Sequence, residues 1–136
     1  MKSADRIRVL IADDHELTRL GLQALIAGWS RFEVVGVAVN GKQAIELVRQ
    51  LQPDVIVLDL QMPALDGLSA ATPIKQFAPA TRIIAYTSVA DPQIEVMTQT
   101  APIDLYCPKD ISSQELIEAI ETLGSLARSG QTQLIG

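Results

Sequence analysis

Residues 55–59, VIVLD, place an aspartate directly after four consecutive apolar residues. A short, unbroken apolar run is typical of a strand that is covered on both faces, as strands are in a parallel sheet. Pro53 lies just upstream and ends the helix-like segment before the run. The stretch therefore predicts a buried strand whose carboxyl end carries Asp59.

Strand and helix signals alternate outward from this stretch toward both ends of the chain. Further strand-like runs occupy residues 7–12, 32–38, 82–86 and 103–107. Helical spacing of apolar residues fills the segments between them, at residues 15–27, 40–51, 67 onward, 91 onward and 112–123. Five strand–helix units in strict alternation predict an α/β fold of three layers, with a parallel sheet between two layers of helices.

Helix-start signals support this division of the chain. Asn40 with Gln43, and Ser112 with Glu115, have the spacing of capping boxes. Asp91-Pro92 combines an N-cap residue with a first-turn proline. These signals predict where three of the helices begin.

Two helices carry more specific expectations. The helix that starts near His15 is expected to turn one apolar face to the core, formed by Leu17, Leu20, Ala24 and Ala27. Pro73 is expected to shorten or kink the helix that follows Gly67, because proline removes a backbone hydrogen bond.

Composition narrows the class of protein. The 136 residues are 48% apolar and carry a net charge of −5, which fits one globular domain with a real core. No run of basic residues exceeds two, so direct nucleic-acid binding is not expected. We expect a cytoplasmic chain, because it has a single cysteine, no signal-peptide-like start and no apolar stretch of membrane-spanning length. Residues 1–124 are predicted to form the domain, and residues 125–136 a linker.

Polar side chains follow four of the five predicted strands. Since ligands of open α/β sheets bind beyond the carboxyl ends of the strands, these groups are expected to converge on one pocket. They are Asp13, Asp14, Asp59, Thr87 and Lys109. Three carboxylates repel one another unless a hard cation such as Mg²⁺ binds between them. A lysine beside them indicates that an anion, most naturally a phosphoryl group, arrives there.

Each of these residues, taken alone, could also have a purely structural role. An aspartate before a helix, such as Asp14, is commonly only an N-cap, and a threonine after a strand only a turn residue. His15 is a candidate metal ligand, but its position favours a helix-start residue. The joint placement of the five polar residues is what favours a binding site.

The sequence resembles the receiver-domain (CheY-like) family of two-component response regulators. The resemblance runs from about residue 7 to residue 123. It rests on the acidic pair Asp13-Asp14, the stretch DLQMPALDG at residues 59–67, Thr87, Tyr106 and Lys109.

The resemblance implies a five-stranded parallel sheet of order 2-1-3-4-5, a flavodoxin-like arrangement. It also implies a switch in which Asp59 accepts a phosphoryl group from a sensor histidine kinase. Magnesium, or alternatively Mn²⁺, would be bound directly by Asp14, Asp59 and the main-chain carbonyl of Gln61, and by Asp13 mostly through water. Lys109 and Thr87 would hold the phosphoryl oxygens, and Tyr106 would move together with Thr87. Such a domain is not an enzyme toward other substrates, since it catalyses only its own phosphorylation and slow dephosphorylation.

A subfamily is also indicated. Asp13-Asp14-His15, the group Arg19, Gly21 and Leu22, and Lys109-Asp110 resemble the NarL/FixJ type of transcriptional regulator. Members of that type carry a helix-turn-helix DNA-binding domain after a linker. The resemblance therefore implies an output domain beyond residue 136, or a self-dimer through the face formed by helix 4, strand 5 and helix 5.

Other readings stay open. Aspartate-nucleophile phosphatases share this layout, but they need an acidic residue at the position where this chain has Gln61. A flavin-binding protein of this fold would need a Ser/Thr/Gly-rich phosphate loop after the first strand, and this chain has none there. A degenerate receiver that acts as a phosphorylation-independent interaction module is the main alternative. Pro108 departs from the family pattern directly before Lys109 and puts the direction of that lysine side chain in question.

Overall fold

The computed structural model describes residues 6–88 and 101–129, in which strands and helices alternate as the sequence predicts. The elements are β1 (Ile7–Ala12), α1 (Glu16–Ala27), β2 (Phe32–Ala38), α2 (Gly41–Leu51), β3 (Val55–Leu58), α3 (Gly67–Phe77), β4 (Arg82–Thr87), β5 (Leu105–Pro108) and α5 (Ser113–Ser129). The helix start predicted at Asp91-Pro92 lies outside the described residues. The fourth strand ends one residue later than predicted, and the fifth is shifted toward Pro108.

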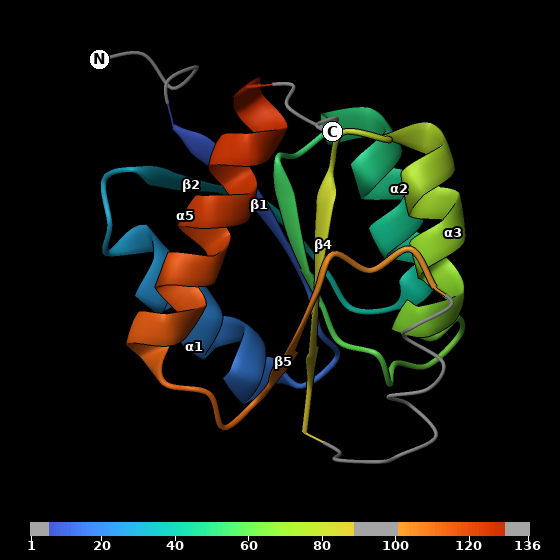
Figure 1. Ribbon diagram of the computed structural model, residues 1–136. Helices are drawn as coiled ribbons and strands as arrows, with labels where there is room; N and C mark the ends of the chain where they lie inside the picture. The colour runs from blue at the N-terminus through green and yellow to red at the C-terminus, as the bar shows by residue number, and fades with distance from the viewer. Residues whose placement is uncertain (1–5, 89–100, 130–136) are drawn as a thin grey trace.

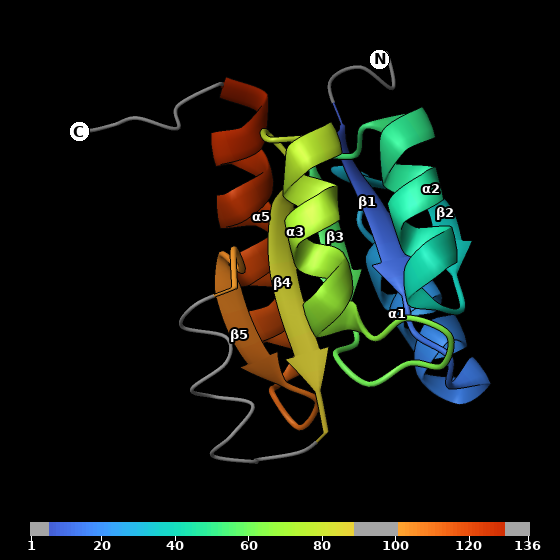
Figure 2. The same ribbon diagram turned by 90° about the vertical axis from the view of Figure 1, so that its right-hand side faces the viewer.

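The strands form one parallel sheet in the order β2-β1-β3-β4-β5, which confirms the predicted order. Helices α1 and α5 cover one face of this sheet and helices α2 and α3 cover the other (Figure 1). Ala12 pairs with Leu58, and Leu58 pairs with Ala85, so the carboxyl ends of the central strands lie side by side. Figure 2 looks onto the face of the sheet that α2 and α3 cover, with α1 and α5 behind the strands. The segments that follow these strands therefore meet at one edge.

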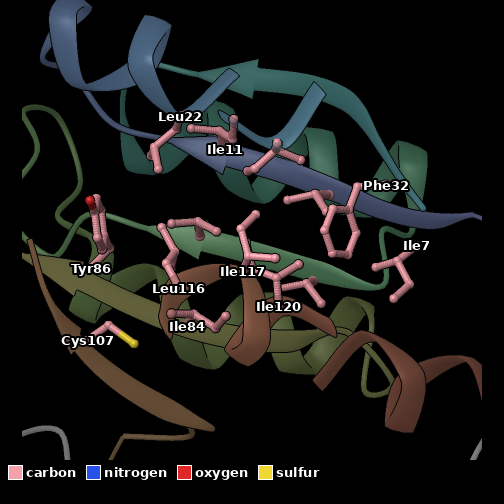
Figure 3. Close-up of a cluster of buried hydrophobic side chains, with 14 residues drawn as sticks. Ile7, Ile11, Leu22, Phe32, Ile84, Tyr86, Cys107, Leu116, Ile117 and Ile120 are labelled. Carbon is pink, nitrogen blue, oxygen red and sulfur yellow. The ribbon is translucent and has the colours of Figure 1, made fainter. Parts of the chain in front are cut away.

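Two apolar cores hold the layers together. All four residues of β3 are buried, as expected for a strand covered on both faces. Ile11, Ile84, Leu116 and Ile120 belong to the core under α1 and α5, which Figure 3 shows. Each fully buried aliphatic side chain of this kind contributes about 1.5–3 kcal/mol. The sheet is thus packed on both faces and supports the loops at its carboxyl edge.

Helix α1 corrects one prediction. The face expected to pack inward is exposed: 86% of Leu17 and 51% of Leu20 are accessible, and Ala24 and Ala27 are exposed as well. The buried residues are Leu22 and Ile26. The helix carries apolar residues on two faces that both fit the helical period, so periodicity alone could not identify the face that packs on the sheet.

Helix α3 continues through Pro73 to Phe77, so this proline does not shorten it as expected. Helix α5 also extends further than predicted and corrects the start of the linker. It reaches Ser129, and Arg128 lies 3.4 Å from the Asp54 carboxylate at the opposite end of the sheet from Asp59. Residues 125–129 therefore belong to the domain, and the linker stays a prediction for residues 130–136, which the structure does not describe. Within residues 6–88 and 101–129, no helix has the length and apolarity needed to cross a membrane.

Candidate functional site

Three carboxylates converge where β1 and β3 end. Asp13 and Asp14 follow β1, and Asp59 follows β3. The backbone N–H of Asp59 donates to the Ala12 carbonyl at 2.9 Å, which places the two strand ends in register. Asp13 and Asp59 are almost fully buried, at 1% and 3% exposure, whereas Asp14 lies at the surface. The structure therefore brings the predicted acidic residues together in one partly enclosed site.

Lys109 reaches this site from the end of β5. Its ammonium lies 2.8 Å from Asp13 Oδ2 and 3.5 Å from Asp59 Oδ2. Its backbone N–H donates to the Thr87 carbonyl at 2.7 Å, which fixes the loop after Pro108 to the end of β4. The proline therefore does not turn the lysine side chain away from the carboxylates.

The two carboxylate oxygens of Asp59 have different surroundings. Oδ1 accepts a hydrogen bond of 3.0 Å from the Gln61 backbone N–H. Oδ2 is buried and accepts no hydrogen bond from any residue that the structure describes. Burial raises the pKa of Asp59 above its ordinary value of 3.8, the Gln61 N–H opposes this, Asp13 raises the pKa further and Lys109 lowers it. Asp59 thus presents one held oxygen and one oxygen that lacks a hydrogen bond.

The donor set fits a small, hard cation. Carboxylate oxygens of Asp13, Asp14 and Asp59 and the Nδ1 atom of His15 all lie within 4.8 Å of one another. Like Asp59 Oδ2, the buried Asp13 Oδ2 accepts no hydrogen bond from the described part of the chain, although it faces the Lys109 ammonium. A buried anionic oxygen that accepts no hydrogen bond raises the free energy of the folded state unless a cation lies beside it. Oxygen ligands of this kind suit Mg²⁺.

The loop between β3 and α3 holds Asp59 in place. The Gly67 N–H donates to the Leu60 carbonyl at 3.2 Å, and a Cβ atom at position 67 would lie 2.0 Å from the Asp59 carbonyl oxygen. Asp66 caps α3 by accepting the Ser69 N–H at 2.7 Å. Glycine is therefore required at position 67, because only it lets the helix start approach the backbone of Asp59 so closely.

The two predicted switch residues lie on neighbouring strands. Thr87 ends β4, is buried, and pairs with Pro108 in the ladder, so it is next to Lys109. Tyr106 pairs with Ala85 and is partly exposed on β5. The structure places Thr87 at the carboxyl edge and Tyr106 within the last strand. Their movement on phosphorylation stays a prediction.

Two residues near the site have contacts that sequence reasoning did not find. The Lys109 ammonium lies 5.9 Å from the centre of the Tyr86 ring, and the Tyr86 hydroxyl donates to the Lys109 carbonyl at 3.5 Å. His15 occupies the N-cap position of α1, as expected, but its side chain makes no cap hydrogen bond. Its Nδ1 lies instead 3.1 Å from Asp13 Oδ1.

Comparisons with known proteins agree with this arrangement. The family model described as "Response regulator receiver domain" matches residues 9–121. Response regulator protein VraR of Staphylococcus aureus is 35% identical over 114 residues, which are 84% of this chain and 54% of VraR. The chain thus spans about half the length of the curated relatives it matches.

Solved structures show the same fold. The signal receiver domain of the putative response regulator NarL from Mycobacterium tuberculosis superposes with a TM-score of 0.84 at 29% identity, over 89% of this chain and 98% of that one. The response regulator domain of Thermotoga maritima CheB gives 0.81 at 32% identity, over 88% and 97% of the two chains. This chain belongs to the response regulator receiver domain family, and its relatives identify it as a CheY-like receiver of the NarL type.

Proposed function

We propose that this domain is a switch activated by phosphorylation of Asp59 in a Mg²⁺-dependent reaction. One observation carries the proposal above the others. Asp59 Oδ2 is buried, accepts no hydrogen bond among the described residues, and lies 3.5 Å from the Lys109 ammonium. Because Asp59 Oδ2 accepts no hydrogen bond from the described residues, it is available to form a new bond. The Lys109 ammonium beside it stabilises added negative charge.

The transfer is largely a matter of position and charge. Asp59 Oδ2 attacks the phosphorus of a phosphohistidine on a sensor kinase, the O–P bond forms and the N–P bond breaks. The leaving imidazole nitrogen keeps the bonding electron pair and takes a proton. The Gln61 N–H holds the other carboxylate oxygen and so orients the attacking one. Lys109 supplies positive charge near the transferred group, as phosphoryl transfer requires.

Asp13, Asp14, Asp59 and the Gln61 carbonyl would hold the magnesium ion, and Mn²⁺ has the same ligand preference. When bound, the ion neutralises the charge that collects on the transferred phosphoryl oxygens. The grouping of the three carboxylates within 4.8 Å of one another supports this assignment.

The switch follows from the new charge. Phosphorylation turns a side chain of about −1 into one of about −1.5 to −2. Thr87 and Lys109 each donate a charge-assisted hydrogen bond to the phosphoryl group, worth about 1.5–3 kcal/mol. Reversing a two-state equilibrium from 1:99 to 99:1 takes about 5.5 kcal/mol, so two such bonds are of the right order. Tyr106 then turns into the space that Thr87 leaves.

Three partners are proposed for this domain: a sensor histidine kinase, an output domain and a second copy of the chain. A sensor histidine kinase supplies the phosphoryl group in the cytoplasm. The output is a DNA-binding domain beyond the described residues, since one similar structure is a DNA-binding response regulator of the LuxR family from S. aureus. Self-dimerisation would use the face that contains Tyr106, where a groove of about 470 Å³ lies between β5 and α5. The domain acts on no substrate other than its own Asp59.

A degenerate receiver that acts without phosphate is less favoured, because the carboxylates of Asp13, Asp14 and Asp59 lie within 4.8 Å of one another and the Lys109 ammonium lies 2.8 Å from Asp13. Intact mass measured before and after treatment with acetyl phosphate and Mg²⁺ tests the proposal. Wild type is expected to gain one phosphoryl group, and both Asp59→Asn and metal-free wild type none. No gain in wild type would favour the degenerate module.

A further inference from the structure

The imidazole of His15 lies among the carboxylates of the proposed metal site. Its Nδ1 is 3.1 Å from Asp13 Oδ1, 3.2 Å from Asp14 Oδ1 and 3.7 Å from Asp59 Oδ2. The ring is 61% exposed and makes no helix-cap hydrogen bond, so the N-cap position does not explain its direction. Its contacts instead place a nitrogen atom that can bind a metal beside the three carboxylates.

The spacing of these atoms is the spacing of ligands around one ion. An octahedral cation with bonds of about 2.1 Å has neighbouring donor atoms about 3 Å apart. Nδ1 approaches the Asp13 and Asp14 oxygens at about this distance, and the Asp59 oxygen is farther away at 3.7 Å. Independently, the Lys109 ammonium, 2.8 Å from Asp13 Oδ2 and 3.5 Å from Asp59 Oδ2, compensates one of the three carboxylate charges, and Asp59 Oδ2 accepts no hydrogen bond from the described residues, which leaves negative charge for a bound cation to neutralise.

We propose that His15 is a direct nitrogen ligand that shifts the preference of this site from Mg²⁺ toward Mn²⁺, Co²⁺ and Zn²⁺. Magnesium prefers oxygen ligands, whereas imidazole suits the later divalent ions. The inference rests on the proposed function, because it concerns the same metal site. It adds a ligand and a metal preference that the oxygen donors alone do not imply.

The sequence makes a direct test available, because His15 is the only histidine of the chain. Untagged protein labelled with ¹⁵N-histidine gives signals from this ring alone. Adding one equivalent of Zn²⁺, which is diamagnetic, is expected to shift the Nδ1 resonance far more than the Nε2 resonance. An Nδ1 resonance that does not respond while Zn²⁺ binds would overturn the proposal.

Calorimetry then measures the metal preference. His15→Ala is expected to lower the affinity for Mn²⁺ and Zn²⁺ by about tenfold or more, and the affinity for Mg²⁺ by less than about threefold. Free imidazole should restore part of the lost Zn²⁺ affinity by occupying the vacated position. Glu16→Ala is the matched control, since it changes the neighbouring exposed residue without removing a ring nitrogen.

The outcomes separate this inference from the proposed function. Equal losses for all three ions in His15→Ala, or none, would overturn the role of His15 and leave the Asp59 site intact. A loss of the same size in Glu16→Ala would also overturn it, because general charge would then explain the change. Wild type that binds none of the ions, or Asp59→Asn that binds them equally well, would contradict the metal site itself.

Discussion

Lys109 is paired more closely with Asp13 than with Asp59: its Nζ lies 2.8 Å from Asp13 Oδ2 and 3.5 Å from Asp59 Oδ2. The ammonium thereby compensates a carboxylate that is 1% exposed, and it stays close to the oxygen that we propose is phosphorylated. A small movement of this side chain would transfer it from Asp13 to a phosphoryl group. Lys109 thus stabilises the resting state and is positioned for the activated one.

Replacing Lys109 by methionine should destabilise the metal-free protein at neutral pH. Removing one partner of a buried ion pair leaves an uncompensated charge, and the free energy of unfolding is expected to fall by about 3 kcal/mol. Urea unfolding measures it, and Mg²⁺ should recover part of the loss, since its binding stays largely in place. Lys109→Arg, which keeps the charge, should lose less. Phosphorylation-dependent dimerisation in Lys109→Met would contradict the proposed coupling.

Asp59→Asn should stabilise the metal-free protein at neutral pH, because it removes a buried charge. The pKa of Asp59 is raised in the folded state, mainly by burial. The stability that protonated Asp59 contributes is therefore fully present below its ordinary pKa of 3.8 and is lost as pH rises through the folded pKa. Unfolding followed from acidic to neutral pH should show the advantage of the variant growing across this window. A constant difference would refute the raised pKa.

Gly67→Ala should be strongly destabilising, by more than about 2 kcal/mol, because its Cβ would lie 2.0 Å from the Asp59 carbonyl oxygen. Gly21→Ala is the matched control in α1, where a Cβ would meet nothing within 4 Å. That substitution should raise stability by about 0.5–1 kcal/mol through helix propensity. Thermal unfolding of both variants tests the pair, and similar effects would contradict the close approach at Gly67.

Ala64→Gly should stabilise the loop next to Asp59. Ala64 has φ of 69°, in the left-handed region where a side chain costs about 1–2 kcal/mol. Relief of that strain exceeds the entropy that glycine adds, so a net gain of about 0.5 kcal/mol is expected. Ala24→Gly, on the exposed side of α1, should instead cost about 1 kcal/mol. Chemical denaturation of both variants checks the opposite signs.

The sheet could be predicted from the sequence because its signals are local. The unbroken apolar run of β3 is buried throughout, and Gln43 donates its N–H to Asn40 Oδ1 as the capping pattern predicts. The convergence of Asp13, Asp59 and Lys109 could also be predicted, since parallel strands bring their carboxyl ends to one edge.

Tertiary contacts account for what the sequence did not reveal. Leu17 and Leu20 are exposed because the other apolar face of α1 packs on the sheet. The helical period fits both faces, so it could not predict which of them is buried. The direction of the His15 ring depends on carboxylates that belong to two different strand ends. The contact of Tyr86 with Lys109 joins β4 to the residue that follows β5, so it depends on the pairing of these two strands and not on the local sequence.

The central claim is that Asp59 itself carries the phosphoryl group. Protein treated with acetyl phosphate and Mg²⁺ can be reduced with borohydride, which converts an aspartyl phosphate to homoserine, and peptide mass spectrometry then locates the converted residue. We predict homoserine at position 59 alone, dependent on the metal and absent when the metal is chelated. Conversion at another aspartate, or none at all, would contradict the account.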